Sequence, residues 1–275
     1  MIIYDLSKLD KNLREDIEQS AQFSSLFSRK PDQLLSVGVD AKTIKSLGVN
    51  VLTGILYLAP HSISGQNVCP LAKIAQCDLP CLNLSGKGRM SNVQMARLRK
   101  TLYWQQYPSE FLAQVKSEVS KLIRKADTIG FVPAIRLNGT SDIRWENYLD
   151  DFMIETTALG AKWYDYTKLP NRKVDPKIYD LTYSYSGVNG YQKYIQMAIE
   201  NKAIKRIAVV FRGEKLPTTF TFKDTYYKKS VFSETTLPVV NGYDTDARFL
   251  DPENVFVGLC AKGPAKQDTT GFVVD

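Results

Sequence analysis

The sequence predicts an α/β fold, a complete or partial (βα) barrel of parallel strands that follows an N-terminal helical extension. From residue 51 to residue 211, short apolar segments typical of buried strands alternate with segments in which apolar residues recur at helical spacing. Such alternation is typical of parallel sheets with right-handed crossovers. The length of 275 residues also suits one barrel domain. We therefore expect residues 1–275 to form a single barrel-like domain.

The individual elements follow from periodicity and from breaks in it. Residues 1–33 carry apolar residues such as Leu9 and Leu13 at helical spacing and read as a helical lead-in. The expected strands are residues 34–39, 51–58, 131–137, 162–167, 179–185, 206–211, 237–240 and 255–259. The expected helices are two within residues 92–125, the second starting at Pro108, then 145–158 and 189–202. Residues 214–235 are polar and β-prone, which predicts an insertion or hairpin.

Composition restricts the class of protein. The net charge of +7 suits an acidic partner, such as a phosphorylated small molecule or nucleic acid, although the basic residues are spread through the chain. No apolar run is long enough to span a bilayer, and the N-terminus has no secretory signal, so we expect a cytoplasmic protein without a membrane partner. Because His61 is the sole histidine, Ser-His-Asp hydrolysis and multi-histidine metal sites are disfavoured.

Three cysteines are the most informative residues. Cys69, Cys77 and Cys81 lie between an apolar strand and a long helix. In a reducing cytoplasm, metal ligation or catalysis is expected for them rather than disulfide bonding. Three thiolates on one loop can hold three irons of a [4Fe-4S] cluster and leave the fourth iron open for chemistry. Zinc is the alternative, with His61, Asp78 or the distant Cys260 as a fourth ligand, and unligated thiols are a third interpretation. Cys260 lies in an apolar strand and is expected to be a core thiol.

Polar side chains follow most of the expected strands. Because active sites of parallel sheets lie beyond the carboxyl ends of the strands, these side chains should converge on one rim. The candidates are Asn138, Asp142, Asp165, Lys168, Arg172, Ser184, Arg212, Asp246 and Arg248. Asp165 lies within an aromatic strand, where an ionised carboxylate needs a cationic partner. Arg136 or Lys168 could be that partner.

The layout of a three-cysteine loop after the first strand of a parallel barrel resembles that of the radical S-adenosylmethionine enzymes. In those enzymes the open iron chelates the amino and carboxylate groups of S-adenosylmethionine. This chain departs from their pattern in two places. Its spacing is Cys-x7-Cys-x3-Cys instead of Cys-x3-Cys-x2-Cys. Residues 138–142, Asn-Gly-Thr-Ser-Asp, stand where a glycine-glycine-glutamate motif would follow the second strand.

A second resemblance covers nearly the whole chain from residue 34 onward. The segments that carry it are Leu-Thr-Gly-Ile-Leu-Tyr-Leu-Ala-Pro (52–60), Arg-Leu-Asn-Gly-Thr-Ser-Asp-Ile-Arg-Trp-Glu (136–146), Tyr-Asp-Tyr-Thr-Lys-Leu-Pro-Asn-Arg (164–172), Arg-Phe-Leu-Asp-Pro (248–252) and Ala-Lys-Gly-Pro-Ala-Lys (261–266). These segments resemble the bacteriophage proteins grouped as the gene product 88 family. The resemblance implies a phage gene expressed in the cytoplasm of a bacterial host.

Together these observations predict a phage-encoded iron–sulfur enzyme of the radical S-adenosylmethionine type, or a relative, with a nucleotide or nucleic-acid-derived substrate. The expected cluster ligands are Cys69, Cys77 and Cys81, and the expected cofactor contacts are Asn138, Asp142 and Ser184. The residues expected to bind substrate or move protons are Asp165, Lys168, Arg172, Arg212, Asp246 and Arg248. The alternative is a zinc-stabilised, non-enzymatic protein that binds nucleic acid or a host partner.

Overall fold

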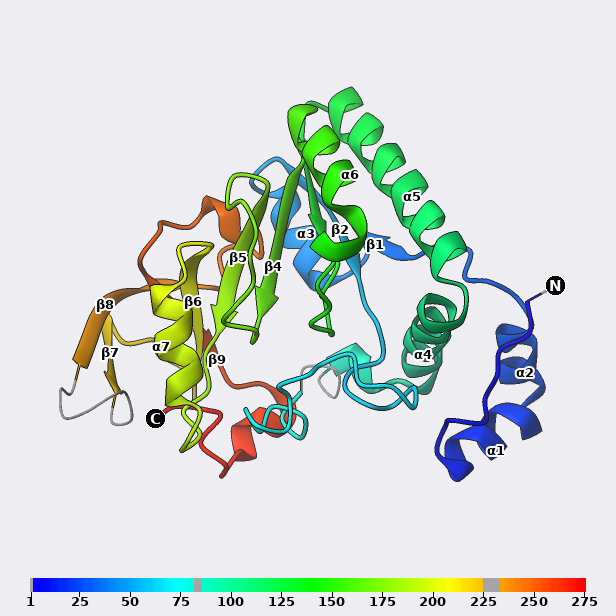
Figure 1. Cartoon of the computed structure of the whole chain (residues 1–275), viewed down its shortest axis with the longest axis horizontal. Coiled ribbons are helices and arrows are strands. Elements are labelled where there is room, and N and C mark those ends of the chain that lie inside the picture. Colours follow the sequence, from blue (N-terminus) through cyan, green and yellow to red (C-terminus); the bar gives the residue numbers. More distant parts are fainter. Residues whose placement is uncertain (1, 82–85, 225–232) are drawn as a thin grey trace.

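The computed structural model describes residues 2–81, 86–224 and 233–275. Within these residues one sheet has the strand order β1-β2-β3-β4-β5-β6-β9-β8-β7. Its strands are β1 (Leu35–Val37), β2 (Val51–Leu56), β3 (Val132–Arg136), β4 (Lys162–Thr167), β5 (Tyr179–Ser184), β6 (Ile204–Phe211), β7 (Thr219–Asp224), β8 (Ser233–Asn241) and β9 (Phe256–Cys260). Figure 1 shows β7 and β8 at one side of the molecule and the N-terminal helices at the other.

The central part of this sheet is parallel. Strands β2 to β6 pair in chain order, β9 joins β6, and β8 joins β9, all in parallel. Parallel pairing places the carboxyl ends of all these strands at the same edge of the sheet. In Figure 1 the arrowheads of β4 and β5 point toward the segment that carries the three cysteines.

The described residues form an open sheet. At one edge β1 pairs antiparallel with β2, and at the other β7 pairs antiparallel with β8. Closure of a barrel requires the two edge strands to pair, and here β1 and β7 occupy opposite edges. The prediction of an α/β fold with a mostly parallel sheet is therefore confirmed, whereas a closed barrel is not formed by the described strands.

The described helices are α1 (Lys11–Gln19), α2 (Ala21–Phe27), α3 (Ala41–Leu47), α4 (Ser91–Gln106), α5 (Pro108–Thr128), α6 (Glu146–Ala158) and α7 (Gln192–Glu200). Short 3-10 turns are η2 (Gly86–Arg89), η3 (Arg248–Leu250) and η4 (Gly263–Gln267). Within the expected segment 214–235, β7 and the first residues of β8 pair as two antiparallel strands. Residues 225–232 between them lie outside the described part of the chain.

Helix α3 was missed by the sequence analysis. The Asp40 carboxylate accepts hydrogen bonds from the backbone N–H groups of Lys42 and Thr43, and the Thr43 hydroxyl accepts one from the Asp40 N–H. This reciprocal pair is a capping box, which satisfies backbone donors that a helix start leaves unpaired. The short helix that it starts carries Lys42 and Lys45.

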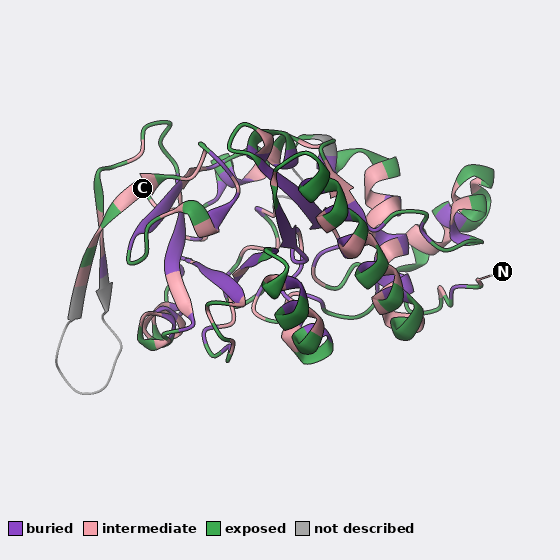
Figure 2. Ribbon diagram, turned by 90° about the horizontal axis from the view of Figure 1, so that it is seen from above, coloured by how far each residue is buried: buried purple, intermediate pink, exposed green. Residues whose placement is uncertain are grey.

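The apolar core lies mainly between the sheet and the long helices. Ile135, Trp163 and Leu181 of the strands pack in one cluster with Phe111 and Val115 of α5. Because side chains alternate across a strand, Ala134 and Tyr164 face the opposite side and form a smaller cluster there. Figure 2 shows the strands buried in the middle of the molecule, with exposed residues on the outer surfaces of the helices.

The N-terminal lead-in consists of α1 and α2; α2 packs on α4, and α1 packs on α2. Tyr4, Ile17 and Phe27 are buried in the same cluster as the residues of α4 and α5. The Arg99 guanidinium of α4 donates to the Leu26 carbonyl oxygen at 2.9 Å and fixes the end of α2. No helix in the described ranges is long and apolar enough to cross a membrane.

Candidate functional site

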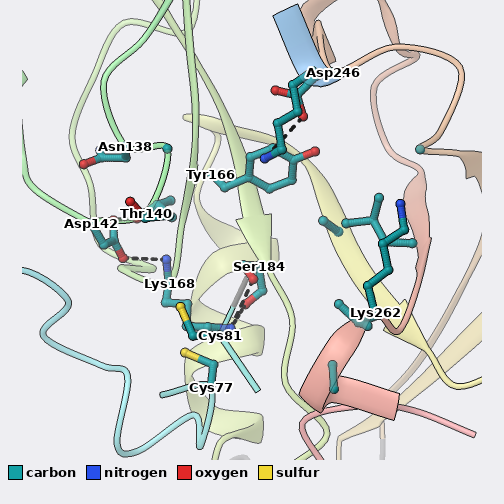
Figure 3. Close-up of a pocket in the computed structure, with 18 of the residues that line it drawn as sticks. Cys77, Cys81, Asn138, Thr140, Asp142, Tyr166, Lys168, Ser184, Asp246 and Lys262 are labelled. Atoms are coloured by element: carbon teal, nitrogen blue, oxygen red, sulfur yellow. Dashed lines mark hydrogen bonds and ion pairs between the residues drawn. The ribbon is translucent and has the colours of Figure 1, made fainter. Parts of the chain in front are cut away.

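A cavity of about 340 Å³ lies at the carboxyl ends of the parallel strands. It is bordered by the cysteine loop after β2, the loop after β3, the ends of β4 to β6, helix α3 and segments that follow β8 and β9. Figure 3 shows the charged and sulfur-bearing side chains that project into it. The predicted residues that line the cavity are Cys69, Cys77, Cys81, Asn138, Asp142, Lys168, Ser184 and Asp246.

The three thiols occupy one end of this cavity. The Cys69 Sγ accepts a hydrogen bond from the His61 N–H at 3.4 Å and lies 3.7 Å from the Thr140 carbonyl oxygen. Burial raises the pKa of the Cys69 thiol to about 12 and also raises the pKa of Cys77. In this environment a thiolate needs a nearby positive charge, and a metal ion is the strongest such charge that proteins use.

Lys168 supplies a cation beside the thiols. Its Nζ donates to the Ser184 carbonyl and hydroxyl oxygens, both at 3.1 Å, and to the Tyr185 carbonyl oxygen at 3.2 Å. Figure 3 places this ammonium group beside Cys77 and Cys81. Burial lowers the pKa of Lys168, and the opposing contributions come from Cys77, Asp142 and the other two thiols. The Lys168 ammonium is thus positioned to offset negative charge that develops on the sulfur atoms.

The loop after β3 forms a rigid wall. The Asn138 Oδ1 accepts from the Ser141 hydroxyl, the Ile143 N–H and the Trp145 indole N–H, at 2.9 to 3.1 Å. Gly139 lies so close to β2 that an added Cβ would be 2.6 Å from the Leu56 carbonyl oxygen. The side chain of Asn138 is therefore used to hold the loop in shape.

Asp142 connects this wall to the end of β4. Its carboxylate accepts from the Thr167 hydroxyl and from the Lys168 N–H, both at 2.8 Å, and lies 4.0 Å from the Arg172 guanidinium. Burial raises the pKa of Asp142, while Arg172 and these hydrogen bonds lower it. Asp142 is 8% exposed, so its carboxylate has little contact with water.

The opposite end of the cavity is charged. The Arg136 guanidinium lies 2.7 Å from the Asp246 carboxylate and 4.6 Å from the centre of the Tyr166 ring, and the Lys42 ammonium is 3.8 Å from the same carboxylate. Burial works to raise the pKa of Asp246, but Arg136 and Lys42 outweigh it and hold the pKa below its usual range. Burial and the charge of Arg136 lower the pKa of Lys42 to about 8.

Asp165 does not line the cavity. Its carboxylate accepts from the Asn138 N–H at 3.0 Å and from the Tyr179 hydroxyl at 2.7 Å, and lies 3.6 Å from the Arg136 Nε. Of the two partners that the sequence suggested for it, Arg136 is the one that it contacts. The carboxylate is fully buried and its contacts join the ends of β3, β4 and β5.

Three predicted arginines also lie outside the cavity. Arg172 is fully buried and pairs with Glu146 through its Nε at 2.9 Å. Arg248 is fully buried and lies 2.9 Å from the Asp251 carboxylate. Arg212 is exposed and pairs with Asp275. The structure thus brings together eight of the twelve predicted residues.

Other cavity residues were not among the predicted ones. They include Lys42, Lys45, Tyr166 and Tyr243. The capping box at Asp40 could have revealed the helix that carries the first two. Lys262 follows the expected strand 255–259, so its place at the rim agrees with the expected convergence of polar residues after the strands. Nothing in the sequence around Tyr243 indicates that its ring borders the cavity.

The donor set bears on which metal could bind. Among residues 2–81, 86–224 and 233–275, no three Cys, His, Asp or Glu side chains lie close enough together to hold a single metal ion. A zinc site needs sulfur atoms about 2.3 Å from one ion, so its ligands must touch. In a [4Fe-4S] cluster each cysteine binds a different iron, and the sulfur atoms stand farther apart. The arrangement of the described side chains is thus not that of a closed zinc site.

The chain matches a known family of proteins. A family model described as gene product 88 matches residues 28–275, which is the chain without most of its N-terminal lead-in. No curated protein and no solved structure matches the chain.

Proposed function

The chain belongs to the gene product 88 family, and from its cavity we propose that it is an iron–sulfur enzyme of the radical S-adenosylmethionine type or a relative. The proposed enzyme is phage-encoded and acts on a nucleotide or nucleic-acid-derived substrate. The observation that carries the proposal is that Cys69, Cys77 and Cys81 line one cavity at the carboxyl ends of parallel strands.

The strand arrangement supports this proposal. The cysteine loop follows β2, which is the first strand of the parallel series, and the wall formed by residues 138–142 follows β3, the second. We interpret β2 to β6 with β9 as a partial (βα) barrel that is open at both edges. Catalytic groups of such folds lie on the loops after the strands, which is where these residues are found.

Each residue of the cavity has a defined part in the proposal. Cys69, Cys77 and Cys81 would hold three irons of the cluster, and Lys168 would offset the negative charge of the thiolates. Asn138 and Asp142 would fix the wall against which S-adenosylmethionine lies. When bound, the cluster would supply one electron to S-adenosylmethionine, as in enzymes that use this pair for radical chemistry. Arg136, Lys42 and Asp246 would contact substrate or hold its protons.

The test is anaerobic purification, with reconstitution by iron and sulfide and measurement of iron, sulfide and zinc. We expect brown protein with about four irons per chain and a broad absorption near 400 nm. Cys69→Ala, Cys77→Ala and Cys81→Ala should each abolish the colour. Cys260→Ala is the matched control, because Cys260 also borders the cavity but contacts the Glu214 carbonyl oxygen, and it should keep the iron.

A second measurement separates the radical enzyme from its relatives. S-adenosylmethionine added to the reduced protein should change the electron paramagnetic resonance spectrum of the cluster if the cofactor binds an open iron. An unchanged spectrum would limit the proposal to an iron–sulfur enzyme without this cofactor. Colourless protein with about one zinc per chain would instead support the zinc-stabilised binding protein.

A further inference from the structure

The cavity carries more positive than negative charge. Among the described residues that line it, the cationic ones are Lys42, Lys45, Arg136, Lys168 and Lys262, and the acidic ones are Asp142 and Asp246. The Asp142 carboxylate accepts hydrogen bonds from the Thr167 hydroxyl and the Lys168 N–H, and the Asp246 carboxylate pairs with Arg136 at 2.7 Å. Lys168 faces the thiols, so the surplus charge lies at the other end of the cavity. A thiolate cluster would not neutralise that end.

Lys45 and Lys262 share one aromatic ring at the mouth of the cavity. Their ammonium groups lie 5.4 and 4.4 Å from the centre of the Tyr243 ring, and both residues are exposed. Lys45 also donates to the Tyr243 carbonyl oxygen at 2.7 Å. Both ammonium groups carry positive charge beside the same ring, so an anion bound there would be attracted by both.

Tyr243 is held firmly in place. Its hydroxyl accepts from the Cys260 N–H at 2.6 Å and donates to the Cys260 carbonyl oxygen at 2.9 Å. Its own N–H donates to Asn241 Oδ1 at 3.0 Å, and the Asn241 amide donates to Asp244 at 2.7 Å. An added Cβ on the preceding Gly242 would be 2.7 Å from the Gly258 carbonyl oxygen, so this turn packs directly on β9. The ring is therefore a fixed platform for the two lysines.

We propose that Lys42, Lys45 and Lys262 bind the phosphate group of the substrate, at the end of the cavity opposite the thiols. This inference rests on the proposed function only for the chemistry done on the substrate. Lysine is a compact point charge that suits phosphate oxygens, and its long side chain can follow the ligand. Between the two ends the cavity is lined by Ala208, Val210 and Leu259, which suit the organic part of a phosphorylated small molecule. Figure 3 shows Lys262 across the cavity from Cys77 and Cys81.

The test uses ribose 5-phosphate and ribose as probes, measured by calorimetry at about 150 mM salt so that weak surface attraction is screened. Saturable binding of ribose 5-phosphate is expected, at least about tenfold tighter than that of ribose. Lys45→Gln and Lys262→Gln should each weaken it about fivefold or more. Lys121→Gln is the control, because Lys121 is exposed on α5 and should change nothing.

Two outcomes would overturn the inference: no saturable binding of ribose 5-phosphate, or equal losses in the control and in the cavity variants. The binding is measured on protein as purified, before reconstitution, and again on a variant with all three cavity cysteines replaced by alanine. Phosphate binding that persists without iron keeps this inference even if the cluster proposal fails. Iron binding without binding of ribose 5-phosphate would overturn this inference and leave the cluster proposal in place.

Discussion

At the scale of single residues, burial and hydrogen bonding distinguish structural from chemical roles. Asp165 has the burial that suggests a catalytic carboxylate, and burial raises its pKa to about 6 against the opposing charge of Arg136. All its hydrogen bonds nevertheless go to protein groups at the ends of neighbouring strands. A carboxylate used in this way holds strand ends together and leaves no oxygen for a substrate.

Asp165→Ala should therefore act on stability. The change leaves the Asn138 N–H, the Tyr179 hydroxyl and the Arg136 guanidinium without their partner in a buried place. We expect the free energy of unfolding, measured by urea denaturation, to fall by about 3–5 kcal/mol. Asp150→Ala, on the exposed surface of α6, should stay within about 0.5 kcal/mol of the wild type. A normal stability for Asp165→Ala would show that its contacts carry little energy.

Asp165 should also make stability depend on pH. Its folded pKa of about 6 lies above the unfolded value of about 3.9. The folded protein therefore binds the Asp165 proton more tightly than the unfolded chain does. The stability gained from this proton is present below about pH 4 and is lost as the pH rises through 6. We expect the stability difference between the wild type and Asp165→Asn to shift against the wild type by about 2 kcal/mol over this range. A constant difference from pH 4 to pH 7 would contradict the raised pKa.

The cavity thiols should react slowly in the protein without iron. Because burial raises the pKa of Cys69 and Cys77, their thiolate fraction at pH 7 is small, and iodoacetamide reacts with the thiolate. Lys168→Met removes a charge that lowers the pKa of Cys77, so alkylation of Cys77, followed by peptide mass spectrometry, should slow further by about threefold or more. Lys121→Met should not change the rate. Faster alkylation in Lys168→Met would mean that Lys168 acts by blocking access to the thiol.

At the scale of elements, the close contact of β2 with the loop after β3 sets the shape of the site. In Gly139→Ala the new methyl group would meet the Leu56 carbonyl oxygen at 2.6 Å and the Ile55 side chain at 2.8 Å. Because the Leu56 backbone cannot move away without a cost in free energy, we expect a loss of about 1–3 kcal/mol in the free energy of unfolding, together with reduced iron retention. Gly213→Ala, whose Cβ would have its nearest neighbour at 3.5 Å, should change neither quantity. Unchanged iron retention in Gly139→Ala would show that the loop is not needed for the cluster.

The elements also show how far sequence alone could lead. Strands β2 to β6 were predictable because each is a short segment rich in apolar or aromatic residues and is followed by polar residues. This local pattern also located the cavity residues of those loops. The place of β9 between β6 and β8 was not predictable, because it depends on pairing between segments distant in the chain. The pairing of Arg172 with Glu146, 26 residues earlier in the chain, was likewise not apparent from the sequence. Arg248 instead pairs with Asp251, only three residues further along the chain.

At the scale of the whole molecule, the cavity and the N-terminal lead-in are separate. Residues that line the cavity begin at Ala41, whereas the lead-in ends at Phe27, with α2 packed on α4 and α1 packed on α2. The gene product 88 match likewise begins at residue 28. The open sheet and its cavity should therefore form without the lead-in, and the lead-in should contribute stability by covering apolar residues of α4.

Removal of residues 2–27 tests this division. The truncation removes Tyr4, Ile17 and Phe27, which are buried in the same core cluster as Leu98 and Tyr103 of α4. We expect the melting temperature, followed by circular dichroism, to fall by about 5–10 °C, which corresponds to a few kcal/mol in a chain of this size. Binding of ribose 5-phosphate and retention of iron should stay within about twofold of the full chain, since every group assigned to them lies after residue 40. A truncated protein that remains folded but loses either property would show that the N-terminal helices shape the cavity through α4.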